Sequence, residues 1–285
     1  SIMPSAIKSA WSVLDNKGIV ALLSKSSLHL ASKVSYTDEI IFERSVKELR
    51  SQMEAEDDLK DILDTVLDIK PGYYPYTIST LQLREEIAEA ARIVGENQPE
   101  VGLEIGTAKG GSFYIWSRYV DSLNTLVSLD LPGGQFGGGY NERQSDLFRT
   151  FSSSINMGFV RDDSHERSTF EEIESLVGGN VDFLFIDGDH TYEGVKADFE
   201  MYGDLVRDDG IIMFHDIVEH PDNQSEVERR RSECTGLDDR HLRWSEANQY
   251  CNVDKAWAEI KNEYDTKEII SHPKQTWGGI GVVYM

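Results

Sequence analysis

The stretch that decides the fold is LEIGTAKGGSFYIW, residues 103–116. It passes from a short apolar run into a turn with three glycines and then into a second apolar segment. This pattern is typical of a strand, a tight turn and a helix, because glycine allows the backbone to turn sharply and to approach a ligand. The amino end of the helix, near Ser112, favours negative charge. We therefore expect a ligand where the strand ends.

The segments around this stretch repeat the pattern. Short apolar runs alternate with helix-like segments, and the chain ends in two further runs, KEIISHP and GGIGVVYM, joined by a short turn around residues 277–279. Strands that alternate with helices predict a parallel sheet covered on both faces, and the last two runs predict an antiparallel hairpin. The fold class is therefore α/β, a Rossmann-like doubly wound, mostly parallel seven-stranded sheet with an antiparallel last strand. The first five expected strands are 101–106, 125–130, 157–163, 181–187 and 210–216.

An N-terminal helical segment precedes this sheet. Residues 5–70 have helical periodicity, and KPGYYPY, residues 70–76, interrupts it with two prolines and a glycine. We place the boundary there, with a helical segment at 1–75 and a ligand-binding domain at 76–285. The next helix is expected to begin with Ser79 and Gln82 as a capping box and to end at Gly95. The early amphipathic helices either pair between subunits of a homo-oligomer or pack on their own sheet.

The composition limits the partners. The 285 residues include 51 acidic and 28 basic side chains, for a net charge of −23. Such a chain repels phosphate backbones, so nucleic acid is not an expected partner. No run reaches the roughly 18 apolar residues that a membrane span needs. The two cysteines, Cys234 and Cys251, have no zinc or redox spacing, which indicates free thiols in a reducing, cytoplasmic compartment. The acidity fits either a halophile or an ordinary acidic cytosolic protein.

The glycine spacing argues against two common nucleotide motifs. A dinucleotide fingerprint needs GxGxxG, but Ala108 stands where the middle glycine should be. A phosphate loop needs lysine after its glycines, but Lys109 stands before Gly110 and Gly111. Glu104 would repel a pyrophosphate, whereas it suits a ligand that carries an ammonium group.

Asp130 ends the second expected strand, 24 residues after Gly106. An acid in this position can accept two hydrogen bonds from a ribose diol. The glycine-rich stretch DLPGGQFGGGY, residues 130–140, follows this strand and not the first one, so it is badly placed to hold phosphates. It is either a mobile lid beside the site or a plain connecting loop.

These features resemble the class I S-adenosylmethionine-dependent methyltransferases. Glu104, Gly106 and Gly110 match the first-strand motif, and Asp130 matches the ribose-binding acid. RDDSHE, residues 161–166, resembles the adenine-side motif, although Asp162 replaces its glycine. The resemblance implies that S-adenosylmethionine is bound by Glu104, Gly106, Thr107, Gly110, Gly111, Ser112, Asp130, Asp163, Ser164 and Asp187.

Residues 185–217, FIDGDHTYEGVKADFEMYGDLVRDDGIIMFHDI, are similar to a branch with cephalosporin-hydroxylase-like proteins and macrolide-sugar O-methyltransferases. This resemblance implies methyl transfer to a hydroxyl of a sugar, a glycan precursor or a glycosylated small molecule. In metal-dependent members, the positions of Asp187, His215 and Asp216 hold a divalent ion, and magnesium is the expected one. That branch usually has two acids, or an acid and an amide, at the end of the fifth strand, and His215 departs from this pattern. Either His215 is a metal ligand, or it is the catalytic base, or no metal binds at this position.

Proton removal from a hydroxyl needs a base or a metal ion. Because the ends of adjacent parallel strands lie close together, Asp187, His215 and Asp216 are expected to converge. The catalytic candidates are His190, His215 and Asp187; alternatively, His190 only hydrogen-bonds its turn. Asp198 is expected to face solvent or an arginine. His220, His241 and His272 are expected at the surface.

Other side chains allow two interpretations. Arg229, Arg230 and Arg231 either recognise an anionic acceptor or form a solvated helix face. Tyr140, Trp244 and Trp277 either stack on a sugar or pack in the protein. Two other functions remain open: a nicotinamide-dependent oxidoreductase, which the missing GxGxxG disfavours, and a non-catalytic scaffold on a methyltransferase fold.

Overall fold

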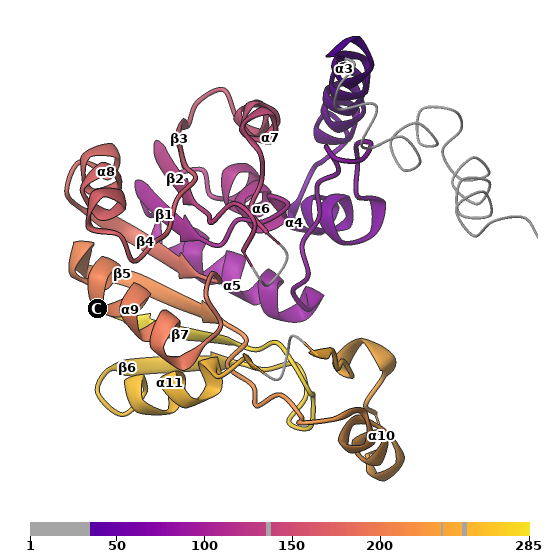
Figure 1. Ribbon diagram of the computed structural model, residues 1–285, viewed down its shortest axis with the longest axis vertical. Helices are drawn as coiled ribbons and strands as arrows, with labels where there is room; N and C mark the ends of the chain where they lie inside the picture. Colours follow the sequence, from indigo (N-terminus) through magenta and orange to yellow (C-terminus); the bar gives the residue numbers. More distant parts are fainter. Residues whose placement is uncertain (1–34, 135–137, 235, 247–249) are drawn as a thin grey trace, which may run out of the picture.

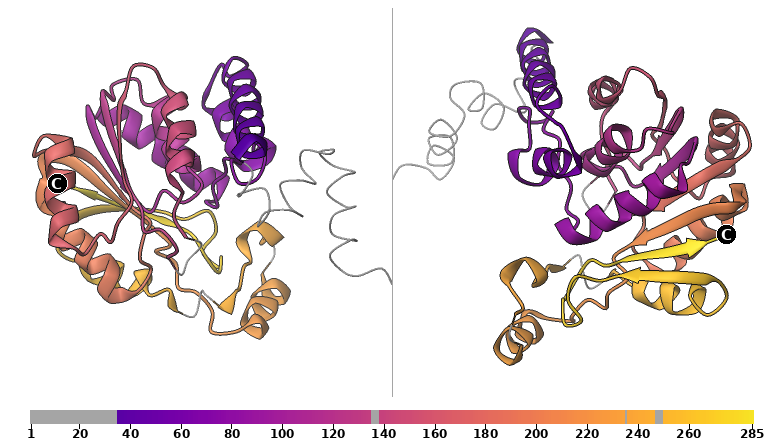
Figure 2. Two further views of the ribbon diagram at one scale, coloured as in Figure 1. Left: turned by 45° about the horizontal axis from the view of Figure 1, so that its top comes forward. Right: turned by 180° about the vertical axis from the view of Figure 1, so that it is seen from behind.

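The computed structural model describes residues 35–134, 138–234, 236–246 and 250–285. A seven-stranded sheet lies between two layers of helices, as Figures 1 and 2 show. The strand order is β3-β2-β1-β4-β5-β7-β6, in which the first five strands are parallel and β7 runs antiparallel to both neighbours. The predicted fold class is confirmed. The strands are β1 Val101–Ile105, β2 Thr125–Leu129, β3 Asn156–Val160, β4 Val181–Ile186, β5 Val206–His215, β6 Asp265–Ile269 and β7 Ile280–Tyr284.

The helices form the outer layers. One layer packs in a hydrophobic cluster with the Phe183 and Phe185 side of β4, and the other with the Leu184 and Ile186 side. A further helix, α10 (Gln224–Glu233), stands away from the sheet (Figure 1). No helix in the described ranges combines the length and the apolar character needed to cross a bilayer. The first layer contains α5 Arg84–Asn97, α6 Gly111–Tyr119 and α7 Glu142–Phe148, and the second contains α8 Arg167–Val177, α9 Tyr192–Tyr202 and α11 Val253–Ile260.

Strand alternation determines which side chains face the first layer. Side chains alternate between the faces of a strand, so Glu104 lies on the opposite face from Leu103 and Ile105. Leu103 and Ile105 belong to the cluster of α8, α9 and α11. Glu104 therefore points toward α6, on the face that carries Phe185 and Met213. The same alternation determines which side chains face the first helix layer at the carboxyl ends of the strands.

The N-terminal helices α3 (Ser35–Met53) and α4 (Leu59–Asp64) pack on this layer. Ile41 and Leu49 are buried in the hydrophobic cluster that includes α6. Glu56 accepts hydrogen bonds from the Tyr114 hydroxyl and from Arg118 Nε, the latter at 3.1 Å. The expected boundary at residue 75 and pairing between subunits stay predictions, and residues 1–34 lie outside the described part of the chain.

The start and end of α5 differ from expectation. Leu83 is its N-cap and forms no side-chain cap, so the capping box of Ser79 and Gln82 is wrong. The Gln82 amide instead donates to Asp187 Oδ2 at 2.7 Å, because a hydrogen bond to a buried carboxylate is stronger than one to a backbone group. Gly95 does not end the helix, which continues to Asn97 and ends with Gln98 in the left-handed region.

The ten-residue connection between β6 and β7, residues 270–279, is longer than the turn expected at 277–279. Glu86 of α5 is fully buried and holds this connection. It accepts hydrogen bonds from Ser271 N at 2.9 Å, Gln275 Nε2 at 2.7 Å and Gly279 N at 2.7 Å. The connection in turn supports the site, because Gly278 N donates to Asp216 Oδ1 at 2.9 Å.

Replacing Glu86 with alanine should lower the free energy of unfolding by about 3–5 kcal/mol, because three buried donors lose their acceptor. Urea denaturation of the purified variants measures this change. Glu86→Gln should lower the free energy of unfolding by less, since the amide oxygen can still accept hydrogen bonds. The matched control is Glu85→Ala, which removes an exposed partner of Arg240 and should have a much smaller effect. Equal losses for Glu86→Ala and Glu85→Ala would contradict this role.

Candidate functional site

A cavity of about 780 Å³ lies at the carboxyl ends of β1, β2, β4 and β5. This is the size of a small-molecule site and the place where doubly wound sheets bind their ligands. The glycine-rich turn after β1, Asp130 after β2 and Asp187 after β4 all line it. His190, His215 and Asp216 line the same cavity, so one space joins the expected cofactor site to the expected reaction site.

The turn after β1 is shaped by two glycines. Gly106 has φ +93°, and a Cβ on it would lie 2.0 Å from the Asp187 carbonyl oxygen. Gly110, with φ 76°, is the N-cap of α6. Thr107 is buried, and its Oγ1 lies 2.6 Å from Ser128 Oγ. The turn therefore brings the backbone of residues 106–112 to the cavity, where Gly106, Thr107, Gly111 and Ser112 form part of the wall.

Glu104 lies behind this wall. Its side chain is fully buried and accepts a hydrogen bond from Ser112 Oγ, and Glu104 is not among the lining residues. Burial raises the pKa of Glu104 well above its usual range, although Ser112 opposes this shift. The expected direct contact between Glu104 and a ligand stays a prediction, and Ser112 stands between them here.

Asp130 faces the cavity and is positioned by the turn. Ala108 N donates to Asp130 Oδ2, and Ala108 adopts the left-handed conformation with φ 47°. Burial raises the pKa of Asp130 to about 6, while the backbone N–H groups of Ala108 and Leu131 oppose the rise. A carboxylate with this environment is ionised at neutral pH and sensitive to mild acid. Gly133, Gly134 and Gly138 also line the cavity, and residues 135–137 of the expected lid lie outside the described residues.

The loop after β3 forms another wall. Asp163 and Ser164 line the cavity, and the Tyr202 hydroxyl donates to the Ser164 carbonyl oxygen at 2.7 Å. His165 Nε2 lies 3.3 Å from Asp198 Oδ1. Asp198 is fully buried, so the expectation that it faces solvent or an arginine is wrong. The reason is the orientation of α9, which turns this side chain toward the β3 loop.

Asp187 is the centre of the opposite wall. The β4–β5 register pairs Ile186 with Phe214, which brings Asp187 beside His215. Asp187 Oδ1 lies 3.1 Å from His215 Nδ1 and 3.2 Å from His190 Nε2. With the bond from Gln82, the carboxylate contacts two other segments of the chain and its own turn.

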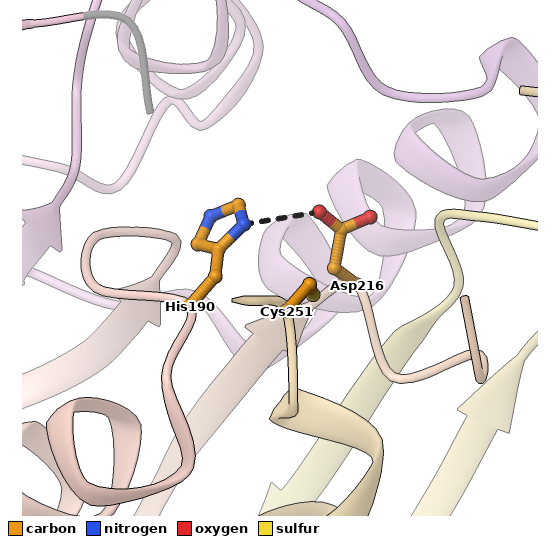
Figure 3. A group of neighbouring side chains, drawn as sticks. All are labelled: His190, Asp216 and Cys251. Atoms are coloured by element: carbon orange, nitrogen blue, oxygen red, sulfur yellow. Dashed lines mark ion pairs between the residues drawn. The ribbon is translucent and has the colours of Figure 1, made fainter. Parts of the chain in front are cut away.

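Asp216 completes this group. It adopts φ 63°, a left-handed conformation that costs a non-glycine residue about 1–3 kcal/mol. Gly278 N holds its Oδ1, and its Oδ2 lies 3.3 Å from His190 Nδ1. The His190 ring thus lies between two carboxylates, those of Asp187 and Asp216. Figure 3 shows its approach to Asp216, with Cys251 beside them.

The carboxylates hold protons on the imidazole rings. Burial alone would lower the pKa of His215, but the charges of Asp216 and Asp187 outweigh it and raise that pKa to about 9. The pKa of His190 is likewise raised well above its usual range, against burial, by Asp187, Cys251 and Asp216. Burial would raise the pKa of Asp187 and of Asp216, but the two rings lower both. Without a metal, protons on the rings therefore balance the carboxylate charges.

Two sets of side chains have the residue types of a metal site. Asp187, His215 and Asp216 place their candidate ligand atoms within 4.8 Å of one another. His190, Asp216 and Cys251 do the same. The three predicted ligands are thus brought together, and metal binding by them stays a prediction.

Several neighbours of the site were not found from the sequence. His220 was expected at the surface, but its side chain is only 2% exposed and its Nε2 lies 3.8 Å from Asp216 Oδ1. His241 is also buried, with its ring centroid 5.7 Å from that of His272. Cys251 is a buried free thiol that lines the cavity. The segment from 217 to 251 has no motif or periodicity that could have shown these positions.

The aromatic and basic candidates divide between core, cavity and surface. Tyr140 packs in the core, so for this residue the packing interpretation is the better one. Trp277 lines the cavity, with the Arg243 guanidinium 5.2 Å from the centre of its ring. The arginines of α10 do not line the cavity and pair with nearby acids, in agreement with a charged helix face. Among the described residues, Arg243 is thus the arginine that lines the cavity.

Comparison with known proteins gives a family match for the central part of the chain. Residues 103–217 match a family model described as a methyltransferase domain. The chain is 29% identical over 141 residues to the uncharacterized protein R132 of Acanthamoeba polyphaga mimivirus, covering 50% of this chain and 62% of R132. It is 29% identical over 124 residues to the uncharacterized protein y4gI of Sinorhizobium fredii, covering 42% of this chain and 13% of y4gI. The chain therefore spans less than two thirds of these curated relatives.

A solved structure shares the fold. The O-methyltransferase from Bacillus cereus, determined in complex with SAH, superposes with a TM-score of 0.50 at 18% identity. The alignment covers 86% of this chain and all of the other. At this identity the likeness shows the fold, and it agrees with the observed strand order.

The stability of chelator-treated protein should depend on pH through the buried rings. A group whose pKa is raised on folding stabilises the protein below its unfolded value, and this contribution is lost as the pH rises through the folded value. For His215 the loss should occur between pH 6.5 and about 9. Urea unfolding at a series of pH values measures it, and His215→Gln should flatten the curve in this window.

The pKa of His165 is raised to about 9, mainly by its bond to Asp198. The contribution of His165 to the free energy of unfolding should therefore be lost over the same pH range. The effect of His215 is therefore the difference between wild type and His215→Gln. His165→Gln serves as the matched control, because it removes the contribution of His165 and leaves those of His190, His215 and His220 in place. Parallel curves for wild type and His215→Gln would contradict the assignment.

Proposed function

Because residues 103–217 match a methyltransferase-domain family model, we propose that the protein transfers a methyl group from S-adenosylmethionine to a hydroxyl group. The acceptor we propose is a sugar, a glycan precursor or a glycosylated small molecule. One observation carries the proposal: a single cavity contains the glycine-rich turn, Asp130 and the Asp187 cluster. A cofactor held by the glycine-rich turn and Asp130 would face the Asp187 cluster.

The cofactor part of the cavity has the groups that S-adenosylmethionine needs. Asp130 can accept two hydrogen bonds from the ribose diol. The free N–H groups at the start of α6 favour the carboxylate of the methionine moiety. Asp163 and Ser164 lie on the β3 loop, where the adenine would contact them. The remaining proposed cofactor-binding residues are Glu104, Gly106, Thr107, Gly110, Gly111, Ser112 and Asp187.

The reaction is an in-line displacement. The acceptor oxygen forms a bond to the methyl carbon, the bond between carbon and sulfur breaks, and the sulfur leaves with the electron pair as a neutral thioether. The hydroxyl proton must go to a base within hydrogen-bond reach. Asp187, His190 and His215 are the candidates in this cavity, and a ring can serve only after it has lost a proton to solvent or to a bound cation.

Asp187, His215 and Asp216 are the proposed ligands of a divalent ion. One partly buried and one buried carboxylate together with an imidazole fit such a cation, and His215 Nε2 has no hydrogen-bond partner among the described residues. The imidazole departs from the oxygen ligands that magnesium prefers. When bound, the ion would lower the pKa of the acceptor hydroxyl and orient it.

The nicotinamide-dependent alternative has little support. Ala108 occupies the place of the middle glycine of a dinucleotide fingerprint, and the family match is to a methyltransferase domain. A scaffold without activity would not need carboxylates buried at the mouth of a ligand-sized cavity, since such groups are costly to bury.

Asp130→Asn should weaken S-adenosylmethionine binding by roughly tenfold to 100-fold at neutral pH, because a charge-assisted acceptor is lost. In the wild-type protein, affinity should fall as the pH falls through about 6, where Asp130 becomes protonated. Isothermal titration calorimetry measures both effects. The exposed Asp121→Asn is the matched control and should bind like wild type. Equal pH dependence in wild type and Asp130→Asn would refute the ribose contact.

Asp187→Asn should lower the rate of methyl transfer by about 100-fold to 10,000-fold while weakening cofactor binding much less. The assay is single-turnover transfer of labelled methyl to a panel of glycosylated hydroxyl compounds, followed by mass spectrometry of the product. Asp208→Asn, at an exposed position of β5, should keep the wild-type rate. A rate that survives Asp187→Asn would show that the base and the proposed ion site lie elsewhere.

A further inference from the structure

Cys251 is held in the cavity by its own backbone. The next residue, Asn252, donates its N–H to the His190 carbonyl oxygen at 2.8 Å. This bond fastens the start of α11 to the turn after β4 and keeps the thiol beside the His190 ring. The Cys251 side chain is buried and forms no disulfide.

The candidate ligand atoms of His190, Asp216 and Cys251 lie within 4.8 Å of one another. The three residues come from three separate segments, and Figure 3 shows their side chains gathered at one point. His190 and Cys251 are not members of the Asp187–His215–Asp216 set, so only Asp216 is shared between the two sets. This group is therefore a second possible cation site in the same cavity.

His220 supplies an independent observation. Its side chain is 2% exposed, and its ring nitrogens have no oxygen or nitrogen hydrogen-bond partner among the described residues, while the Cys251 thiol is close enough to interact with the ring. A buried polar group without a partner is costly unless a ligand satisfies it. Its Nε2 lies 3.8 Å from Asp216 Oδ1, and the ring is next to the Cys251 thiol. The His220 ring thus lies at the edge of the same group.

The residue types select the kind of ion. Magnesium prefers oxygen ligands, whereas a thiolate favours zinc and similar transition metals. Two imidazoles, a thiolate and a carboxylate are a ligand set for tetrahedral zinc. Zinc bound at about 2.0–2.3 Å would draw these side chains closer together than they stand here.

We propose that His190, Asp216 and Cys251, with His220 as the fourth ligand, bind a thiophilic divalent cation of the zinc class. On binding, the Cys251 thiol and the protonated rings each release one proton to solvent, so that sulfur binds as thiolate and both rings bind in their neutral form. The ion then lies on the wall of the cavity and ties His220 and Cys251 to the turn after β4. The site does not need Asp187 or His215, and its occupancy can be measured without any methyl acceptor.

The test uses cobalt as a spectroscopic probe. The full chain is stripped with a chelator and titrated with Co²⁺, which gives a near-ultraviolet charge-transfer band only when a thiolate is a ligand. The chain has two cysteines, so Cys234→Ser leaves Cys251 as the sole thiol and is the matched control. Cys234→Ser should keep the band, and Cys251→Ser should lose it. Circular dichroism checks that each variant is folded.

Zinc affinity, measured by displacement of cobalt, should fall roughly tenfold to 100-fold or more in Cys251→Ser and in His220→Gln. Asp187→Asn should retain the cobalt band, which separates this site from the one proposed for methyl transfer. Absence of the band from the folded Cys234→Ser protein would overturn the proposal. Loss of the band in folded Asp187→Asn would also overturn it, because the thiolate-bound ion would then require Asp187, which is not one of the four proposed ligands. Neither result depends on whether methyl transfer is observed.

Discussion

The site depends on the contacts of one buried carboxylate. Asp187 follows β4 and contacts Gln82 before α5, His190 in its own turn and His215 at the end of β5. Each contact offsets part of the cost of burying the charge, since an isolated carboxylate in this position would be strongly destabilising. The same contacts bring the ends of neighbouring strands and the segment before α5 to one wall of the cavity.

Asp216, on the same wall of the cavity, is positioned indirectly by a residue of α5. Fully buried Glu86 fastens the connection between β6 and β7, and that connection supplies the Gly278 N–H to Asp216. Asp216 adopts a strained, left-handed backbone conformation in this position, and its carboxylate lies close to His190. Strained residues of this kind are found where a function requires them. The arrangement concentrates carboxylates, imidazoles and a thiol in a small volume whose charge must be balanced by protons or by a cation.

The parts of the site that could be predicted follow directly from strand periodicity. A strand that ends in Asp130 or Asp187 delivers that residue to the carboxyl edge of a parallel sheet, wherever the rest of the chain lies. Gly106 was predictable because a glycine directly after an apolar run allows a tight turn, and the structure shows a positive φ and a close backbone contact there. Glu104 and Asp198 were harder, because alternation and helix orientation decide whether a charged side chain faces a ligand or another buried partner.

The sequence by itself determined the order of strands and helices, the glycine-rich turn and the acids that follow β2 and β4. These are local properties, set by the periods of apolar residues and by the conformations that glycine allows. Only the tertiary structure decided that Gln82 and Cys251 join Asp187 and Asp216 around one cavity, with His220 beside Asp216. Their positions depend on how distant segments pack against one another, and the spacing of residues within a single segment cannot predict that packing.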